Sequence, residues 1–448
     1  MKRLILCFDG TWNTLSDPTV VTNVVKVADA VNLRDPEGVH QICYYNSGVG
    51  SGGPIDRITG GVFGAGLKNN VKRGLAFLTQ NYDAGGNGEE PDEIYLFGFS
   101  RGAYTARAVA GVLGAVGIPW EVRDSEVHWE TYRKIAKLRS KQRDLDPKSR
   151  RYQRLDEKIQ EIQNPKDATA AEGKTVNKPK THTPESIKVK CIGVFDTVGS
   201  YGIPAGLGLG ALPHVFTYWT RGFHSRKISD RVDVALHAMA IDEMRRPFAP
   251  TFWTRKPDDK VVDGQVVEQV WFPGVHCNIG GGYEDTRLSD MALAWMISKV
   301  QKHTKLNFNR KTIEEEVWPC SAGMVYRTSK GGWFSKARTI LPAIQEMVKP
   351  DPKLRIRLNE AVHWSVKERY RFEKAPMEGL GFTKYAPGNL KTETYSKPTR
   401  LEQELCSPTR EWLPDKCPLK GAGLPCECKT SAPKYFAEGR NEPQRDAA

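Results

Sequence analysis

Short, unbroken apolar runs recur along the first 300 residues, and segments with apolar residues at helical spacing lie between them. Such runs are typical of strands that are buried on both faces of a parallel sheet. They predict strands at 3–8, 39–45, 93–99, 187–195 and 266–275. The helical spacing predicts helices at 23–33, 69–81, 101–115, 229–243 and 288–300. Because strands and helices alternate, we expect an α/β fold with a mostly parallel, doubly wound sheet.

The alternation is interrupted between residues 121 and 186. Apolar residues at 152, 155, 159 and 162 stand among Lys, Arg, Asp and Glu, which predicts an amphipathic charged helix. We expect it to complete a helical hairpin broken near Pro147, with a disordered linker after it. The sequence therefore predicts a main domain over 1–300 that carries 121–186 as an insertion. An irregular C-terminal extension, 301–448, is expected to pack on this domain and to be poorly ordered from about 385.

A glycine-rich loop follows the second predicted strand, from Gly48 to Gly66. Its first residues, 48–53, spell G-x-G-x-x-G, as in dinucleotide-binding turns. In those turns the glycines open a helix directly, whereas Pro54 and more glycines follow here. We interpret the loop as a flexible rim beside a site. It is a candidate lid, as are the insertion and the aromatic stretch at 216–219.

The five residues Gly98-Phe99-Ser100-Arg101-Gly102 fit the pattern G-x-S-x-G. This pattern marks the nucleophile elbow of α/β hydrolases, a sharp strand-to-helix turn that lifts a serine hydroxyl above the sheet. The pentapeptide also occurs by chance, and an inert serine in an ordinary turn is the alternative. A predicted strand before it and an alanine-rich helix after it favour the elbow. Ser100 is therefore the candidate nucleophile, and Gly98 and Gly102 permit the turn.

An elbow serine needs an acid and a histidine, which follow it along the chain in that order. Asp196 ends a predicted strand, at the carboxyl edge of the sheet where α/β folds bind ligands. His276 follows the next predicted strand and opens a glycine-rich loop. We predict Asp196 as the orienting acid and His276 as the general base. Other candidates stay open: His363 as base, Asp285 or Asp290 as acid, with His237 expected inside a buried helix.

Acyl transfer also needs two backbone N–H groups directed at the developing negative oxygen. One is expected from Arg101, directly after the nucleophile. The other is expected from the loop after the first strand, at Gly10 or Thr11. Asp9 starts this loop, where it would order the loop or bind a cation. A simple turn is the alternative interpretation of this segment.

Four blocks of the sequence together resemble the signature of a family of uncharacterised α/β hydrolases. The blocks are 6–13 (LCFDGTWN), 98–107 (GFSRGAYTAR), 195–199 (FDTVG) and 271–283 (WFPGVHCNIGGGY), with further similarity at 238–243 and 363–366. The family includes the lipase effectors of bacterial type VI secretion and many fungal proteins. The resemblance implies a triad at Ser100, Asp196 and His276, and ester substrates of which phospholipids are the best known. The charged insertion and the cysteine-containing tail depart from the pattern.

The net charge and the length of the apolar runs indicate which partners the protein binds and where in the cell it is located. Lys and Arg number 66 against 53 Asp and Glu, a formal net charge of +13. Such an excess attracts phosphate-bearing partners, although a solvated basic face is the simpler interpretation. We expect peripheral contact with anionic membrane surfaces and no nucleic-acid binding. The first apolar run stops at Asp9, too early for a signal peptide, and no run has the ~20 residues of a membrane span. We expect a cytoplasmic protein, with export lacking a cleaved signal left open.

Nine cysteines are present. Four of them lie in or just after strand-like runs and are expected to be reduced, namely Cys7, Cys43, Cys191 and Cys277. Four others crowd the C-terminus without the paired spacing of zinc sites, namely Cys406, Cys417, Cys426 and Cys428. Whether these four bind metal or form disulfides stays open.

The sequence as a whole favours a serine hydrolase of carboxylic esters, with lipid esters of the phospholipase A type as one substrate class and an acyl-enzyme intermediate. No metal or organic cofactor is expected. A catalytically silent binding protein on the same fold, with a basic surface, is one alternative. A thioesterase or peptidase that uses the same triad is another.

Overall fold

The computed structural model describes most of the chain up to residue 326 and several shorter segments after it. The described residues are 1–10, 21–48, 60–86, 88–142, 145–146, 148–163, 181–182, 186–198, 228–243, 245, 248–255, 262–326, 356–357, 360–371, 375–377, 381–383 and 396–405.

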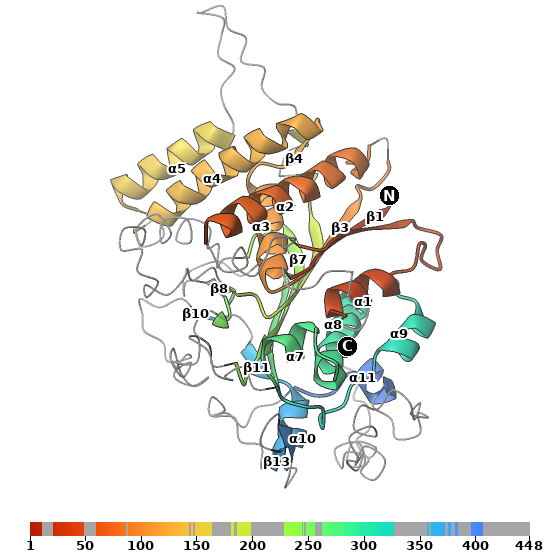
Figure 1. Cartoon of the computed structure of the whole chain (residues 1–448). Coiled ribbons are helices and arrows are strands. Elements are labelled where there is room, and N and C mark those ends of the chain that lie inside the picture. Colours follow the sequence, from red (N-terminus) through yellow and green to blue (C-terminus); the bar gives the residue numbers. More distant parts are fainter. Residues whose placement is uncertain are drawn as a thin grey trace, which may run out of the picture.

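A seven-stranded sheet forms the centre of the molecule (Figure 1). Its strands are β1 Arg3–Phe8, β2 Gln41–Asn46, β3 Glu93–Phe99, β6 Val189–Phe195, β7 Val232–Ala240, β9 Val266–Phe272 and β11 Glu360–Val362. They are ordered β11-β9-β7-β6-β3-β1-β2, and every neighbouring pair is parallel. The carboxyl ends of all seven strands therefore meet at one edge. The expected α/β fold with a parallel sheet is confirmed.

Helices cover both faces of this sheet, as in a doubly wound fold (Figure 1). One face packs against α1 Asn23–Ala30 and α8 Arg287–His303, and the same core is extended by α9 Arg310–Glu316 on α1 and α11 Arg400–Leu405 on α8. The other face packs against α2 Gly60–Asn81 and α3 Arg101–Ala115, and that core is extended by α4 Ser125–Gln142 and α5 Arg150–Gln163.

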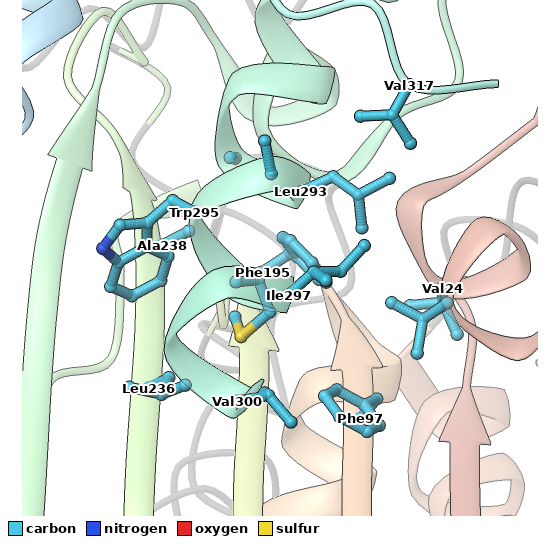
Figure 2. Close-up of a cluster of buried hydrophobic side chains, with 14 of the residues drawn as sticks. Val24, Phe97, Phe195, Leu236, Ala238, Leu293, Trp295, Ile297, Val300 and Val317 are labelled. Carbon is cyan, nitrogen blue, oxygen red and sulfur yellow. The ribbon is translucent and has the colours of Figure 1, made fainter. Parts of the chain in front are cut away.

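Side-chain alternation along each strand explains how one apolar run supplies two cores. In β1, Ile5 and Cys7 face the α8 side, whereas Leu4, Leu6 and Phe8 face the α3 side. Figure 2 shows α8 crossing the first of these faces, with Trp295, Ile297 and Val300 above Phe97, Phe195 and Leu236. Burying each such side chain contributes roughly 1.5–3 kcal/mol. This packing holds the strand ends, and hence the site, in place.

The expected helix at 229–243 is wrong, because this segment forms strand β7. Strand β7 lies between β6 and β9 and is buried almost throughout. A strand covered on both faces carries no polar alternation, so its Ala-, Leu- and Met-containing run resembles a helix in sequence. His237 is therefore a buried strand residue.

Two expected loops contain helices. Helix α2 begins at Gly60, so residues 60–66 belong to a helix and not to the glycine-rich loop. Strand β9 ends at Phe272, and the short helix α7 His276–Gly280 begins where a loop was expected.

The insertion contains the 3-10 turn Val122–Asp124, helices α4 and α5, and strand β5 Thr181–His182. Strand β5 pairs antiparallel with β4 Ile118–Pro119, just before the insertion. Helices α4 and α5 pack on one another, and α4 also packs on α2 and α3. The hairpin break at Pro147 and most of the expected linker lie outside the described residues.

The C-terminal part adds strand β11 to the edge of the sheet beside β9, followed by α10 Trp364–Arg371. Two small antiparallel pairs join β8 Thr254–Arg255 to β10 Ile356–Arg357, and β12 Ala375–Met377 to β13 Gly381–Thr383. The division at residue 300 stays a prediction, as does the order of the tail. Among the described helices, none is both long and apolar enough to cross a membrane.

Candidate active site

Ser100 occupies a strained turn between β3 and α3. Its φ of 57° lies in the left-handed region that non-glycine residues rarely adopt. A Cβ on Gly102 would lie 2.0 Å from the carbonyl oxygen of Phe8, and one on Gly98 would lie 2.5 Å from the carbonyl oxygen of Gly102. Only glycine fits either position, which explains both flanking glycines of the motif. The turn directs the Ser100 side chain to the carboxyl edge of the sheet.

The structure brings Ser100, His276 and Asp196 together in one hydrogen-bonded row. Nε2 of His276 lies 2.8 Å from Oγ of Ser100, and Nδ1 lies 2.6 Å from Oδ2 of Asp196. Each residue follows a different strand of the sheet, β3, β9 and β6. All three side chains are buried. This geometry suits transfer of a proton from a serine hydroxyl to an imidazole held by a carboxylate.

Strand β7 fixes Asp196. The second carboxylate oxygen, Oδ1, accepts the N–H of Ala240 at 3.1 Å, and the φ of Asp196 is 40°, again in the left-handed region. The N–H of the next residue, Thr197, donates to Nε2 of His237 at 3.1 Å. Burial and the charge of Arg107 hold the pKa of His237 well below its usual range, so its ring is neutral and can accept this bond. The sequence gives no sign of this contact of His237, because its apolar surroundings resemble a helix and conceal that the residue lies on a strand beside β6.

A second set of contacts, also missed from the sequence, fixes His276 from the chain after β7. Oδ2 of Asp242 accepts the N–H of Gly274 at 2.6 Å. Oε2 of Glu243 accepts the N–H of His276 itself, at 3.3 Å. The imidazole lies between the rings of Phe99 and Phe248, with each centroid 4.8 Å away. The motif at 238–243 was visible in the sequence, but its contact with the histidine depends on tertiary packing.

The rival residues have other partners. Asp285 forms an ion pair with Arg287 at 2.6 Å, and Asp290 pairs with Lys26 at 2.7 Å. His363 is fully buried between Glu402, 2.6 Å away, and Ser365, 2.7 Å away. None of the three is in the hydrogen-bonded row of Ser100.

Two of the three expected oxyanion donors, Arg101 and Gly10, are described and lie beside Ser100. Arg101 begins α3, and the first N–H groups of a helix point out of its end. Burial lowers the pKa of the Arg101 guanidinium to about 10, so it keeps its charge at neutral pH. A Cβ on Gly10 would lie 3.7 Å from Cβ of Ser100, but the N–H of Gly10 donates to Oδ1 of Asp9 at 2.6 Å. Thr11 lies outside the described residues.

Asp9, directly after β1, is a buried carboxylate whose hydrogen bonds join this turn to the start of α1 and to β2. Besides Gly10, it accepts the hydroxyls of Thr22 at 2.7 Å and Tyr45 at 2.8 Å. Burial raises the pKa of Asp9 to about 6, because these three hydrogen bonds only partly offset the loss of water. These contacts suit the loop-ordering role that the sequence suggested. Among the described residues, no cluster of His, Cys, Asp and Glu could hold a metal ion.

The raised pKa of Asp9 gives a pH-dependent prediction. The folded state binds the proton of this carboxyl more tightly than the unfolded state does. The protonated carboxyl therefore contributes its full stability below the unfolded pKa, and this contribution is lost as the pH rises through the folded pKa. Asp9→Asn removes this dependence. Urea unfolding is expected to show the variant gaining roughly 2–2.5 kcal/mol relative to wild type between about pH 4 and pH 7. A constant difference across this range would contradict the raised pKa.

Among the described cysteines, Cys7 and Cys191 are buried, Cys43 is exposed, and all are free thiols, as are Cys277 and Cys320. Burial raises the pKa of Cys277, beside the proposed base, to about 12, so its thiol is neutral at ordinary pH. The four C-terminal cysteines, 406 to 428, lie outside the described residues.

One curated protein is similar to part of this chain. An uncharacterised protein of Saccharomyces cerevisiae is 28% identical over 273 residues, which cover 57% of this chain and 33% of that protein. The chain thus spans a third of the length of this curated relative.

Two solved structures match this chain with low sequence identity and low TM-scores. One is an uncharacterised protein from Pseudomonas aeruginosa, 16% identical with a TM-score of 0.39, over 68% of this chain and 46% of that one. The other is the Tle1 effector bound to the VgrG spike of a type VI secretion system, 17% identical with a TM-score of 0.33, over 63% of this chain and 51% of that one.

The family model for the catalytic domain of Tle1-like type VI secretion phospholipase effectors matches residues 2–299, well over half of the chain. The match spans Ser100, Asp196 and His276. The chain therefore belongs to the family of type VI secretion, Tle1-like phospholipase effector catalytic domains.

Proposed function

We propose that this chain is a serine hydrolase of carboxylic esters, with phospholipids as its substrate class. The observation that carries the proposal is the buried row from Ser100 through His276 to Asp196, with spacings of 2.8 and 2.6 Å. Membership of a phospholipase effector family supports the choice of lipid esters. The formal charge of +13 supports contact with anionic lipid surfaces.

The proposed reaction uses two acyl transfers. Oγ of Ser100 attacks the ester carbonyl while its proton passes to Nε2 of His276, and Asp196 stabilises the imidazolium through Nδ1. The N–H of Arg101, with Gly10 or Thr11, would stabilise the tetrahedral oxyanion. His276 then protonates the leaving alcohol, which gives the acyl-enzyme. Water, deprotonated by His276, attacks that ester, and His276 returns the proton to Oγ of Ser100 as the fatty acid leaves. For Gly10 to act as a donor, its N–H must leave the carboxylate of Asp9.

Labelling with a fluorophosphonate probe tests the nucleophile. Wild type is expected to be labelled at one serine, and Ser100→Ala is expected to abolish labelling. Ser365→Ala is the matched control, because Ser365 also contacts a histidine, at 2.7 Å, but is fully buried. It should leave labelling intact. A folded wild-type protein that takes up no probe, or a Ser100→Ala variant that is still labelled, would overturn the proposal.

The substrate class needs a separate measurement. Initial rates with phospholipids, neutral esters, thioesters and peptides of matched acyl groups are expected to be highest for a phospholipid. A preference for thioesters or peptides would retain the triad and replace the proposed substrate.

A further inference from the structure

Arg245 and Glu243 form an ion pair directly beside His276. Nε of Arg245 donates to Oε1 of Glu243 at 2.9 Å, and Nη2 donates to Oε2 at 2.8 Å. Glu243 is deeply buried and also accepts the N–H of His276. This pair therefore fixes the orientation of the guanidinium relative to the proposed base.

The ring of Phe248 contacts both the guanidinium of Arg245 and the imidazole of His276. Cζ of Arg245 lies 3.8 Å from the centroid of Phe248, and Phe248 meets His276 edge to face. Stacking on Phe248 restrains the arginine further, so little conformational freedom is left to lose when a ligand binds.

The open side of the guanidinium is available to a ligand. The Arg245 side chain is 24% exposed, whereas that of Glu243 is 1% exposed. Within the described part of the chain, the side-chain hydrogen bonds of Arg245 use only Nε and Nη2, while its backbone N–H donates to Oε1 of Glu243 at 2.8 Å. Nη1 and the second hydrogen of Nη2 therefore remain for an acceptor. A planar guanidinium with two adjacent N–H groups matches the oxygens of a phosphate.

We propose that Arg245 is a specificity-determining residue that binds the phosphate of the ester substrate while Ser100 attacks its acyl group. The inference rests on the proposed function. In a glycerophospholipid, the phosphate and an acyl ester are carried by neighbouring glycerol carbons. A cation one aromatic ring from the base is thus well placed for the phosphate when the carbonyl reaches Ser100.

Equilibrium binding in the Ser100→Ala background tests the proposal without turnover. The ligands are a short-chain phosphatidylglycerol, the diacylglycerol with the same chains, and inorganic phosphate. Arg245→Gln is expected to weaken phosphatidylglycerol binding about 10- to 100-fold and leave diacylglycerol binding unchanged, because charge-assisted hydrogen bonds are lost. Arg245→Lys, which keeps the charge but loses the paired N–H groups, is expected to fall between the two.

Two controls separate recognition from structure. Arg123→Gln removes the same charge from an arginine that is 81% exposed and paired with Glu121, and it should change no affinity. Glu243→Gln keeps the guanidinium but loosens the pair that orients it, so it should weaken phosphatidylglycerol binding less than Arg245→Gln does, while the preference for the phosphate-bearing lipid persists. Melting curves for each variant check its fold.

Equal loss of both lipids in Arg245→Gln, an unchanged preference, or no binding of either lipid would overturn the proposal. Inorganic phosphate binding as tightly as phosphatidylglycerol would overturn the assignment to a lipid headgroup. Hydrolysis by the protein with Ser100 intact is measured in parallel. If Arg245 governs binding but neither lipid is hydrolysed, the proposed function fails while the recognition role stands.

Discussion

Alanine at Ser100 and alanine at His276 are each expected to lower kcat by about 10⁶-fold, and the double variant by no more than either. The two side chains lie 2.8 Å apart, and in the proposed mechanism they act in one proton transfer, so removing either disables the other. The residual rate would come from substrate binding and the oxyanion donors. The measurement is kcat for a soluble short-chain ester at saturation, compared across the two single variants and the double variant.

Two further variants frame this result. Asp196→Asn is expected to lower kcat about 10⁴-fold, because Nδ1 of His276 then loses the carboxylate that holds its tautomer. His303→Ala removes a partly exposed histidine at the end of α8, which lies 3.7 Å from Glu268 of β9. This variant should leave kcat unchanged. Losses that multiply in the double variant would mean that Ser100 and His276 do not act as a unit.

Glu402→Ala is expected to destabilise the fold by about 3–5 kcal/mol, because it leaves the buried His363 and three further donors without their acceptor. Glu402 is fully buried and accepts bonds from His363 at 2.6 Å and from the indole N–H of Trp364 at 3.0 Å. It also accepts the N–H and hydroxyl of Thr399 at 2.8 and 2.6 Å. Urea unfolding at neutral pH measures the loss.

Glu404→Ala, on the same helix, is the matched control. Its side chain is 37% exposed and pairs with Arg310 and Arg400, and such surface pairs contribute about 1 kcal/mol or less. Equal effects at the two positions would contradict the stabilising role of the buried Glu402.

Burial acts to raise the pKa of Glu402, but His363 and Thr399 outweigh it and hold the pKa below its usual value. The contribution is therefore present near neutral pH and is lost as the pH falls towards that lowered pKa.

The candidate site residues that could be predicted from the sequence are those that come shortly after a strand. Ser100, Asp196 and His276 each come shortly after an apolar run, and parallel strands bring such positions to a common edge. Their mutual distances could not be predicted, since they depend on the register between β3, β6 and β9. The elbow was the most predictable element, because the clash that excludes a Cβ at Gly98 and Gly102 is local to the turn and its neighbouring strand.

The less predictable parts depend on contacts between distant segments. Glu243 and Phe248 contact His276 from a stretch of chain more than 25 residues earlier, and Arg245 contacts both of them. Strand β7 was mistaken for a helix because burial on both faces removes the polar alternation that would distinguish it. Strand β11 has three residues, too few for any periodicity, and only pairing with β9 defines it.

That pairing has a consequence for the order in which the protein can be made. The proposed catalytic residues are all synthesised by position 276, but β9 then still has an unpaired edge. Its backbone N–H and C=O groups stay open until β11 emerges much later in the chain. An open edge on an apolar strand is a template for pairing with another chain. The nascent protein therefore passes through a stage at which its catalytic residues exist but its sheet is prone to aggregation, and the late segment carrying β11 and Glu402 ends that stage.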